Sequence, residues 1–176
     1  MNVGRVLAFG FLAAIAPALS SSAVVAQSPV AIPAAAQELA GEHPAEYYKR
    51  AALLFADGKK DDAVFIFYLG QLRFRTHLLA HRDLDPTGDP AIFDSLSSVV
   101  GPTINRYAFG DIPKLARTID AVLAYDQEHP DTFTSPAEFA AAHTSVRDGL
   151  VSMQTDMLAR ADSIRAQRLK NGLENR

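Results

Sequence analysis

The chain has 176 residues, no cysteine and a formal net charge of −3 at pH 7. The lack of cysteine excludes disulfides, thiol catalysis and cysteine-ligated metal sites. The weakly acidic balance gives no basis for nucleic-acid or anionic-membrane binding, which need a concentrated basic surface. We therefore expect packing alone to stabilise the fold.

Residues 1–26 have the pattern of an export signal peptide. Arg5 precedes an apolar run from Val6 to Ala18, and a tail of small residues follows. The run has about 13 residues, whereas a membrane span takes about 20. We expect cleavage after Ala26 and release, without a membrane anchor, into the periplasm or the medium. The mature chain would carry 16 basic and 20 acidic residues, a net charge of −4.

The next 16 residues differ from the remainder of the chain. Residues 27–42 contain two prolines and many alanines but no large apolar face, which is typical of a flexible spacer. In residues 43–170 every periodic pattern is helical, and no alternating strand pattern occurs. The sequence therefore predicts an all-α fold, a single irregular bundle of about five helices. Residues 171–176 are expected to form a frayed tail.

Prolines and capping residues predict where the helices begin. Pro44 suits the first position of a helix, because its missing N–H would have no partner there. Ser135 and Glu138 have capping-box spacing around Pro136. The expected helices run over residues 44–56, 61–81, 89–100, 111–128 and from 136 onwards, with a break at residues 101–111.

A single apolar stripe marks the last helix. From Phe139 to Ile164 apolar residues recur every three or four positions. If the helix continues to Leu169 it has about 35 residues and a length of about 50 Å, longer than a compact domain of this size. Its far end would then project, fray or meet a partner, including a second copy of the chain. A packed inner half with a frayed basic tail is the other interpretation.

Small and aromatic residues of the first two helices have a familiar spacing, at Tyr47, Ala51, Gly58, Ala63, Phe67 and Gly70. Residues 44–75 thus resemble a tetratricopeptide-type helical hairpin. The pattern departs from that repeat at Arg50 and Arg75, and no second copy is in phase. Because a solenoid needs about three repeats, we expect one hairpin within an irregular bundle. The resemblance implies a groove for a peptide or protein partner.

The second expected helix is apolar almost all round, which predicts a central position in the bundle. Gln71 and Arg75 share the sector through which it would reach water. Arg73 lies in an apolar arc, where an unpaired charge is too costly to keep. It requires either a carboxylate or a route for its head to solvent, so an ion pair and a ligand contact both stay open. The acids considered as partners are Glu46, Asp94, Asp120 and Asp148.

Metal binding is an alternative for the end of this helix and the loop after it. His77 and His81 are four residues apart and lie near one helix face, at a spacing that can share a metal ion. The loop from Asp83 to Asp94 has acids at several positions of a calcium-binding loop, but its prolines stiffen it, and an N-cap at Asp89 explains the pattern equally. The candidate ligands are His77, His81, Asp83, Asp85, Asp89 and Asp94.

The residues of the expected break at 101–111 are candidates for recognition, because Asn105, Arg106 and Tyr107 are typical of interfaces; a structural connector is the alternative. If the break packs beside the end of the second helix, Arg75, His77 and Arg106 would converge.

No nucleophile elbow or phosphate loop occurs. We expect an exported protein- or peptide-binding module, such as an envelope adaptor or toxin inhibitor, with no catalysis and no cofactor. The candidate binding residues are Gln71, Arg73, Arg75, His77, Asn105, Arg106 and Tyr107. The alternative is a protein that binds a small molecule or metal, or a hydrolase, at His77, His81 and Asp83.

Overall fold

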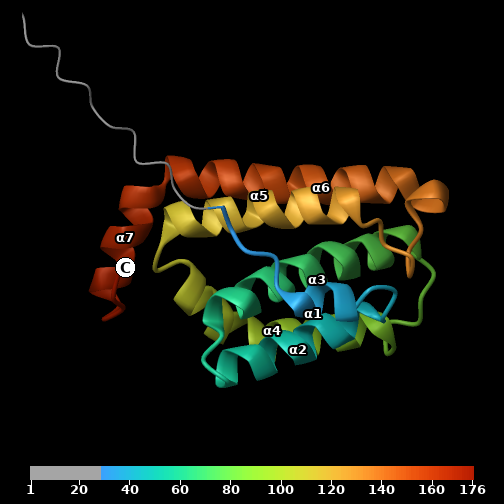
Figure 1. Ribbon diagram of the computed structural model, residues 1–176, viewed down its shortest axis with the longest axis horizontal. Coiled ribbons are helices and arrows are strands. Elements are labelled where there is room, and N and C mark those ends of the chain that lie inside the picture. The colour runs from blue at the N-terminus through green and yellow to red at the C-terminus, as the bar shows by residue number, and fades with distance from the viewer. Residues whose placement is uncertain (1–28) are drawn as a thin grey trace, which may run out of the picture.

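The computed structural model describes residues 29–176 (Figure 1). This part of the chain contains helices and no strand, which confirms the all-α bundle. None of its helices combines the length and the apolar character that crossing a membrane takes. The expected signal peptide, residues 1–26, lies outside the described residues. The helices are α1 (Ala34–Glu38), α2 (Pro44–Ala56), α3 (Lys60–Ala80), α4 (Asp89–Ala108), α5 (Ile112–Glu128), α6 (Pro136–Ala159) and α7 (Ala161–Lys170).

Helix α3 is the centre of the bundle. Helices α2 and α4 pack on one side of it, and α5 and α6 pack on the other (Figure 1). Its residues between Ala63 and His77 are almost all buried, because apolar side chains point in every direction around the helix. The predicted central position of this helix is confirmed.

Helices α2 and α3 form the expected antiparallel hairpin. Gly58 closes the turn between them with a φ of +80°, a conformation that glycine adopts without strain. At the crossing, a Cβ built on Gly70 would lie 2.5 Å from the Cβ of Tyr47. A glycine is therefore required here for the two backbones to approach.

Three predicted helix starts are confirmed. Helix α2 begins at Pro44, α5 begins after Asp111, and α6 begins after Ser135. Asp111 accepts a hydrogen bond from the backbone N–H of Lys114 at 3.0 Å. Ser135 accepts one from Ala137 at 3.3 Å, one residue earlier than in a capping box.

The flexible spacer expected at residues 27–42 is wrong for the described part of it. Ala34–Glu38 form α1, and Ala35, Ala36 and Leu39 are buried in the core. The carbonyl of Leu39 also accepts a hydrogen bond of 2.6 Å from the hydroxyl of Tyr47. The small side chains of Ala35 and Ala36 let this short helix pack against the core without a face of large apolar residues.

The break expected at residues 101–111 is also wrong, because α4 continues through Gly101 and Pro102 to Ala108. Gly101 is buried, and a Cβ built there would lie 3.6 Å from the ring of Phe67. Beyond the proline, Ile104 is buried against the core. Tertiary packing therefore outweighs the local tendency of a Gly-Pro pair to end a helix.

The last helix is not continuous. The chain leaves α6 at Arg160, whose φ is −105° and ψ is 14°, and α7 turns back across the end of the bundle (Figure 1). The expectation of a projecting 35-residue helix is therefore wrong. The tail 171–176 is not frayed either, because the backbone N–H of Arg176 donates to the carbonyl of Gly110 at 2.7 Å.

Candidate functional site

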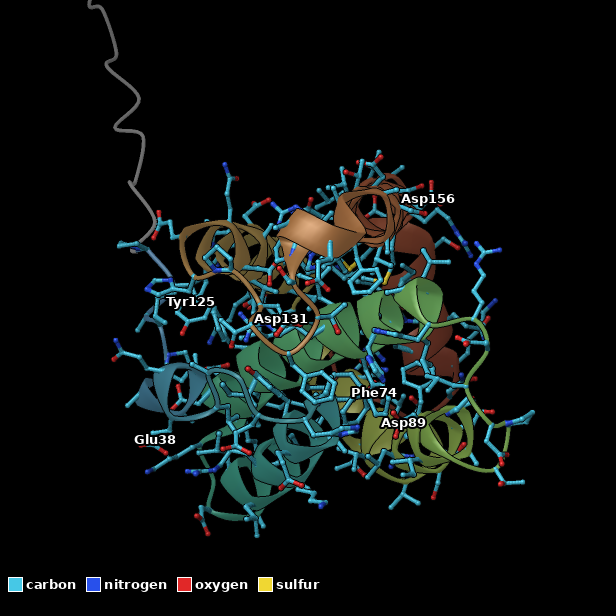
Figure 2. The ribbon with its side chains drawn as sticks, turned by 90° about the vertical axis from the view of Figure 1, so that its right-hand side faces the viewer. Glu38, Phe74, Asp89, Tyr125, Asp131 and Asp156 are labelled. Atoms are coloured by element: carbon cyan, nitrogen blue, oxygen red, sulfur yellow. The ribbon has the colours of Figure 1, made fainter. Side chains whose placement is uncertain are left out.

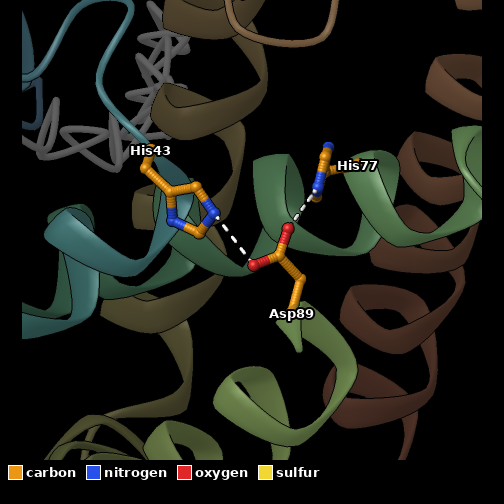
Figure 3. A group of neighbouring side chains, drawn as sticks. All are labelled: His43, His77 and Asp89. Carbon is orange, nitrogen blue, oxygen red and sulfur yellow. Dashed lines mark hydrogen bonds and ion pairs between the residues drawn. The ribbon is translucent and has the colours of Figure 1, made fainter. Parts of the chain in front are cut away.

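Two histidines share one carboxylate at the end of the bundle where α2 and α4 begin (Figure 3). His43 precedes α2, His77 lies in the last turn of α3, and Asp89 is the first residue of α4. The Nε2 of His43 lies 3.3 Å from Oδ1 of Asp89, and the Nε2 of His77 lies 2.8 Å from Oδ2. One side chain from each of three helix termini thus forms what we call the His-Asp-His cluster.

Asp89 is available to both rings because it does not cap its own helix. Gly88 is the N-cap of α4, and no side chain accepts a capping hydrogen bond there. The N-cap role proposed for Asp89 is therefore wrong by one residue. Its carboxylate instead faces away from the α4 backbone, toward α2 and α3 (Figure 3).

The partners of the ring nitrogens define where the protons lie. His43 Nδ1 accepts a hydrogen bond of 3.1 Å from the N–H of Ala45, so this nitrogen carries no proton, and Nε2 is the nitrogen that faces Asp89. Burial lowers the pKa of His77, although the bond to Asp89 acts in the opposite direction. Burial opposes ionisation of Asp89, but its hydrogen bonds with the two rings outweigh this and lower the pKa of that carboxyl. The cluster therefore places the Asp89 carboxylate between two imidazole rings.

The cluster has one apolar side and one open side. The rings of Phe74 and Phe133 lie 5.5 Å and 5.0 Å from the His43 ring. On the other side His43 and Asp89 line a groove of about 550 Å³ between α2 and α4. Solvent and small solutes can therefore reach the carboxylate from this groove.

The other predicted metal ligands do not join the cluster. His81 Nδ1 bonds to the carbonyl of His77 at 2.9 Å. Asp83, Asp85 and Asp94 are exposed, and Asp85 accepts bonds from the N–H and hydroxyl of Thr87, which makes a capped turn. In residues 29–176, the one group of three side chains whose ligand atoms lie within 4.8 Å of one another is His43, His77 and Asp89. Asp89 is the one member of this group that comes from the predicted calcium loop.

Arg73 is a buried structural side chain. Its Nε lies 3.3 Å from Asp126, and its other nitrogens donate to the hydroxyl of Tyr47 and, at 2.8 Å, to the carbonyl of His129. Burial raises the pKa of Tyr47 to about 12, which keeps the phenol protonated. The requirement for a carboxylate is confirmed, but none of the four acids proposed as partners is the one that pairs.

Asp131 is a second buried acid near Arg73 that the sequence did not indicate. Among the described residues, its Oδ2 is the one buried side-chain polar atom without a hydrogen-bond partner. Burial raises the pKa of this carboxyl, although the charge of Arg73 acts in the opposite direction. In Figure 2 Asp131 lies in the loop that crosses the end of the bundle.

Asn105, Arg106 and Tyr107 belong to the last turn of α4 and lie near the start of α3. Asn105 accepts a hydrogen bond from Tyr68, and Tyr107 donates one of 3.0 Å to Asp61. Arg106 is exposed. Sixteen residues separate Asp61 from His77, about 24 Å along a helix, so the convergence of Arg106 with Arg75 and His77 is wrong.

Gln71 and Arg75 line a separate groove, because α4 and α6 both pack on α3 but scarcely contact each other. This α3–α4–α6 groove has a volume of about 620 Å³. The guanidinium of Arg75 lies 5.2 Å from the ring centroid of Phe93 and is the single charged group of the lining. The lining consists of Gln71, Leu72, Arg75, Leu78, Leu79, Phe93, Val146, Gly149, Leu150 and Met153.

No protein-family model matches the chain, and no curated protein or solved structure matches it either. Sequence reasoning missed His43 in the cluster and Asp126 beside Arg73. Neither has a spacing relation to its partner that a pattern could reveal, because they come from different helices.

Proposed function

We propose that the protein is an exported binding module that accommodates an apolar segment of another protein or peptide in the α3–α4–α6 groove, without catalysis of its own. The observation that carries this proposal is an apolar groove of about 620 Å³ with one cationic side chain in its lining. Pockets of about 300–1,000 Å³ hold small ligands or a few anchoring side chains of a peptide.

The chemistry of the lining specifies the partner. Apolar side chains from α3 and α6 favour leucine-like or aromatic anchors, while Arg75 favours a carboxylate placed beside them. Arg75 is exposed and is held over Phe93, so its side chain is partly ordered before binding. We expect an amphipathic segment with an acidic residue next to its apolar anchors.

The lining of the α3–α4–α6 groove contains no histidine, and His43 and His77 lie in the separate His-Asp-His cluster. A partner bound in the groove therefore meets no imidazole that could act as a general base, which supports a role in binding.

Gly149 provides a test of this groove, because a Cβ built there meets no atom within 4 Å. A photoreactive phenylalanine at position 149 should form a discrete adduct with a partner in the envelope fraction, and Arg75→Glu should reduce it. The same photoreactive residue at Leu53, which is 63% exposed on α2, is the control. Equal labelling from both positions would contradict the proposal.

A defined probe separates a peptide from a small amphiphile. The wild type is titrated with a labelled amphipathic peptide carrying one glutamate, with its glutamine counterpart and with palmitate. We expect the glutamate peptide to bind best, and Arg75→Glu to weaken its binding by placing a second negative charge beside the peptide's glutamate. Binding of palmitate alone would instead identify a carrier of small apolar acids.

A further inference from the structure

We infer that the His-Asp-His cluster is a binding site for a divalent transition metal ion, with zinc as the ion that fits it best. Two imidazole nitrogens and a carboxylate oxygen are the donors that zinc takes in proteins. Calcium and magnesium prefer an all-oxygen set, which two histidines do not supply. The site shares no residue with the lining of the α3–α4–α6 groove and does not depend on the function proposed for it.

The spacing of the donors is close to that of a metal site. Zinc lies about 2.0–2.2 Å from its nitrogen and oxygen ligands, so tetrahedral donors stand about 3.3–3.5 Å apart. Here the two nitrogens lie 3.3 Å and 2.8 Å from the carboxylate oxygens, and all three donors lie within 4.8 Å of one another. Because the two nitrogens face different oxygens of Asp89, the three side chains must draw together for one ion to be held by all of them.

The outer contacts of His77 suit a metal ligand. When the ion takes Nε2, the ring proton moves to Nδ1, which lies 3.3 Å from the hydroxyl of Thr134. A histidine ligand that donates its second nitrogen to an oxygen is oriented in this way in known metal sites. His43 differs, because its Nδ1 accepts a hydrogen bond from the N–H of Ala45. A metal ion on Nε2 places the ring proton on Nδ1, so the ring then no longer accepts this capping bond.

Charge and access also favour a cation. Asp89 contributes a carboxylate to the cluster, and its side-chain partners within residues 29–176 are the two histidines, with no lysine or arginine among them. The groove between α2 and α4 opens onto Asp89, and the two other charged side chains of its lining, Glu46 and Lys49, pair with each other at 2.7 Å. Three protein donors leave a tetrahedral ion one position for water from this side.

The test uses the chelator-treated chain from Gln27 to Arg176, titrated with zinc sulfate in a calorimeter and checked by melting temperature. His43→Asn removes the imidazole but keeps a good N-cap, and Asp89→Asn removes the charge. We expect equimolar zinc binding that raises the melting temperature, and a loss of affinity of at least about tenfold in both variants. Cobalt in the same site should give the visible absorption of a tetrahedral ion.

Two matched variants serve as controls. His81→Gln removes the neighbouring imidazole, and Asp85→Asn removes an exposed acid of the same loop. Both should bind zinc as the wild type does. Circular dichroism of His43→Asn establishes that the variant is folded. The inference is overturned if the wild type binds no zinc, if His43→Asn and Asp89→Asn both keep wild-type affinity, or if calcium binds more tightly than zinc.

Discussion

Arg73 and Asp126 form an ion pair in the interior, where their side chains are 3% and 5% exposed. A buried charge stays in place only when its partners satisfy it. Asp126 pairs with Arg73 through Oδ1 and with Arg147 through Oδ2 at 3.0 Å. The single carboxylate thus links α3, α5 and α6. Its loss would remove the ion-pair partner of both Arg73 and Arg147.

Asp126→Asn should therefore lower the free energy of unfolding by about 3–5 kcal/mol, since it removes one partner of a buried pair. Arg73→Met should cost less, because Asp126 keeps Arg147. Urea unfolding measures both, with Asp162→Asn as the control at a side chain that is 99% exposed. A change in Asp126→Asn no larger than that of the control would show that the pair does not hold these helices together.

Asp131 gives a prediction about pH. Because burial raises its pKa in the folded state above the ordinary 3.8, this carboxyl favours folding at low pH, and the benefit is lost as pH rises through the folded-state pKa. Asp131→Asn cannot ionise. The stability of the wild type relative to this variant should therefore fall as pH rises above the ordinary pKa of 3.8, in urea unfolding curves recorded at a series of pH values. A difference in stability that does not change with pH would contradict the raised pKa.

At the residue scale, the sequence predicted that Arg73 needs a carboxylate but did not predict which residue supplies it. The apolar arc around Arg73 predicted a carboxylate, and Asp126 supplies it from 53 residues away. Similarly, the His77 and His81 spacing indicated a possible ligand pair, whereas the structure pairs His77 with Asp89 and His43. Partners on different helices depend on how the helices are arranged, which periodicity does not encode.

At the scale of elements, glycine has two different roles in the helices. Gly70 lies where α2 and α3 cross, and Gly149 lies where α6 faces the open groove. An alanine at either position gains helix propensity, because glycine has the greater freedom to lose on folding. Whether the alanine stabilises or destabilises the fold then depends on the atoms that its new methyl group would meet.

Gly149→Ala should raise the free energy of unfolding by about 0.5–1 kcal/mol, since its new methyl group meets nothing within 4 Å. Gly70→Ala should lower it by about 1–3 kcal/mol, because the methyl would lie 2.5 Å from the Cβ of Tyr47 and the hairpin must open. Guanidinium unfolding of the two variants, compared with the wild type, measures both values. Equal effects at the two positions would contradict the close crossing of α2 and α3.

Helix starts could be predicted and some helix ends could not. Pro44, Asp111 and Ser135 each act within one turn, so the local sequence contains the signal. The continuation of α4 through Pro102 and the turn at Arg160 depend on contacts with distant segments. Local rules therefore fail where tertiary packing decides.

At the scale of the whole molecule, the arrangement around α3 creates both grooves. Two helices on each side cover most of α3, but α4 and α6 leave a strip between them. The groove between α2 and α4 exposes the His-Asp-His cluster on a different part of the surface. An all-α bundle with a central helix could be predicted from composition and periodicity, but these hollows could not, because they depend on how far apart neighbouring helices lie.

The chain end contributes to this arrangement. The guanidinium of Arg176 lies 3.6 Å from the ring centroid of Tyr107 and donates to the Tyr107 carbonyl at 2.7 Å. Arg168, which is 9% exposed, donates to the carbonyl of Glu174 at 2.8 Å. These contacts fasten α7 to the corner between α4 and α5.

Removal of residues 171–176 should therefore lower the free energy of unfolding by about 1–2 kcal/mol, from one cation–π contact and the lost hydrogen bonds of two arginines. Arg176→Ala should account for about half of this loss, since Arg168 keeps its bonds to Glu174 and Asn175. Urea unfolding gives the totals, and faster amide exchange in α7 would localise them. If truncation changed neither stability nor exchange, the tail would be frayed in solution, and α7 would be held by the apolar contacts of Ala161 and Ile164 with the core.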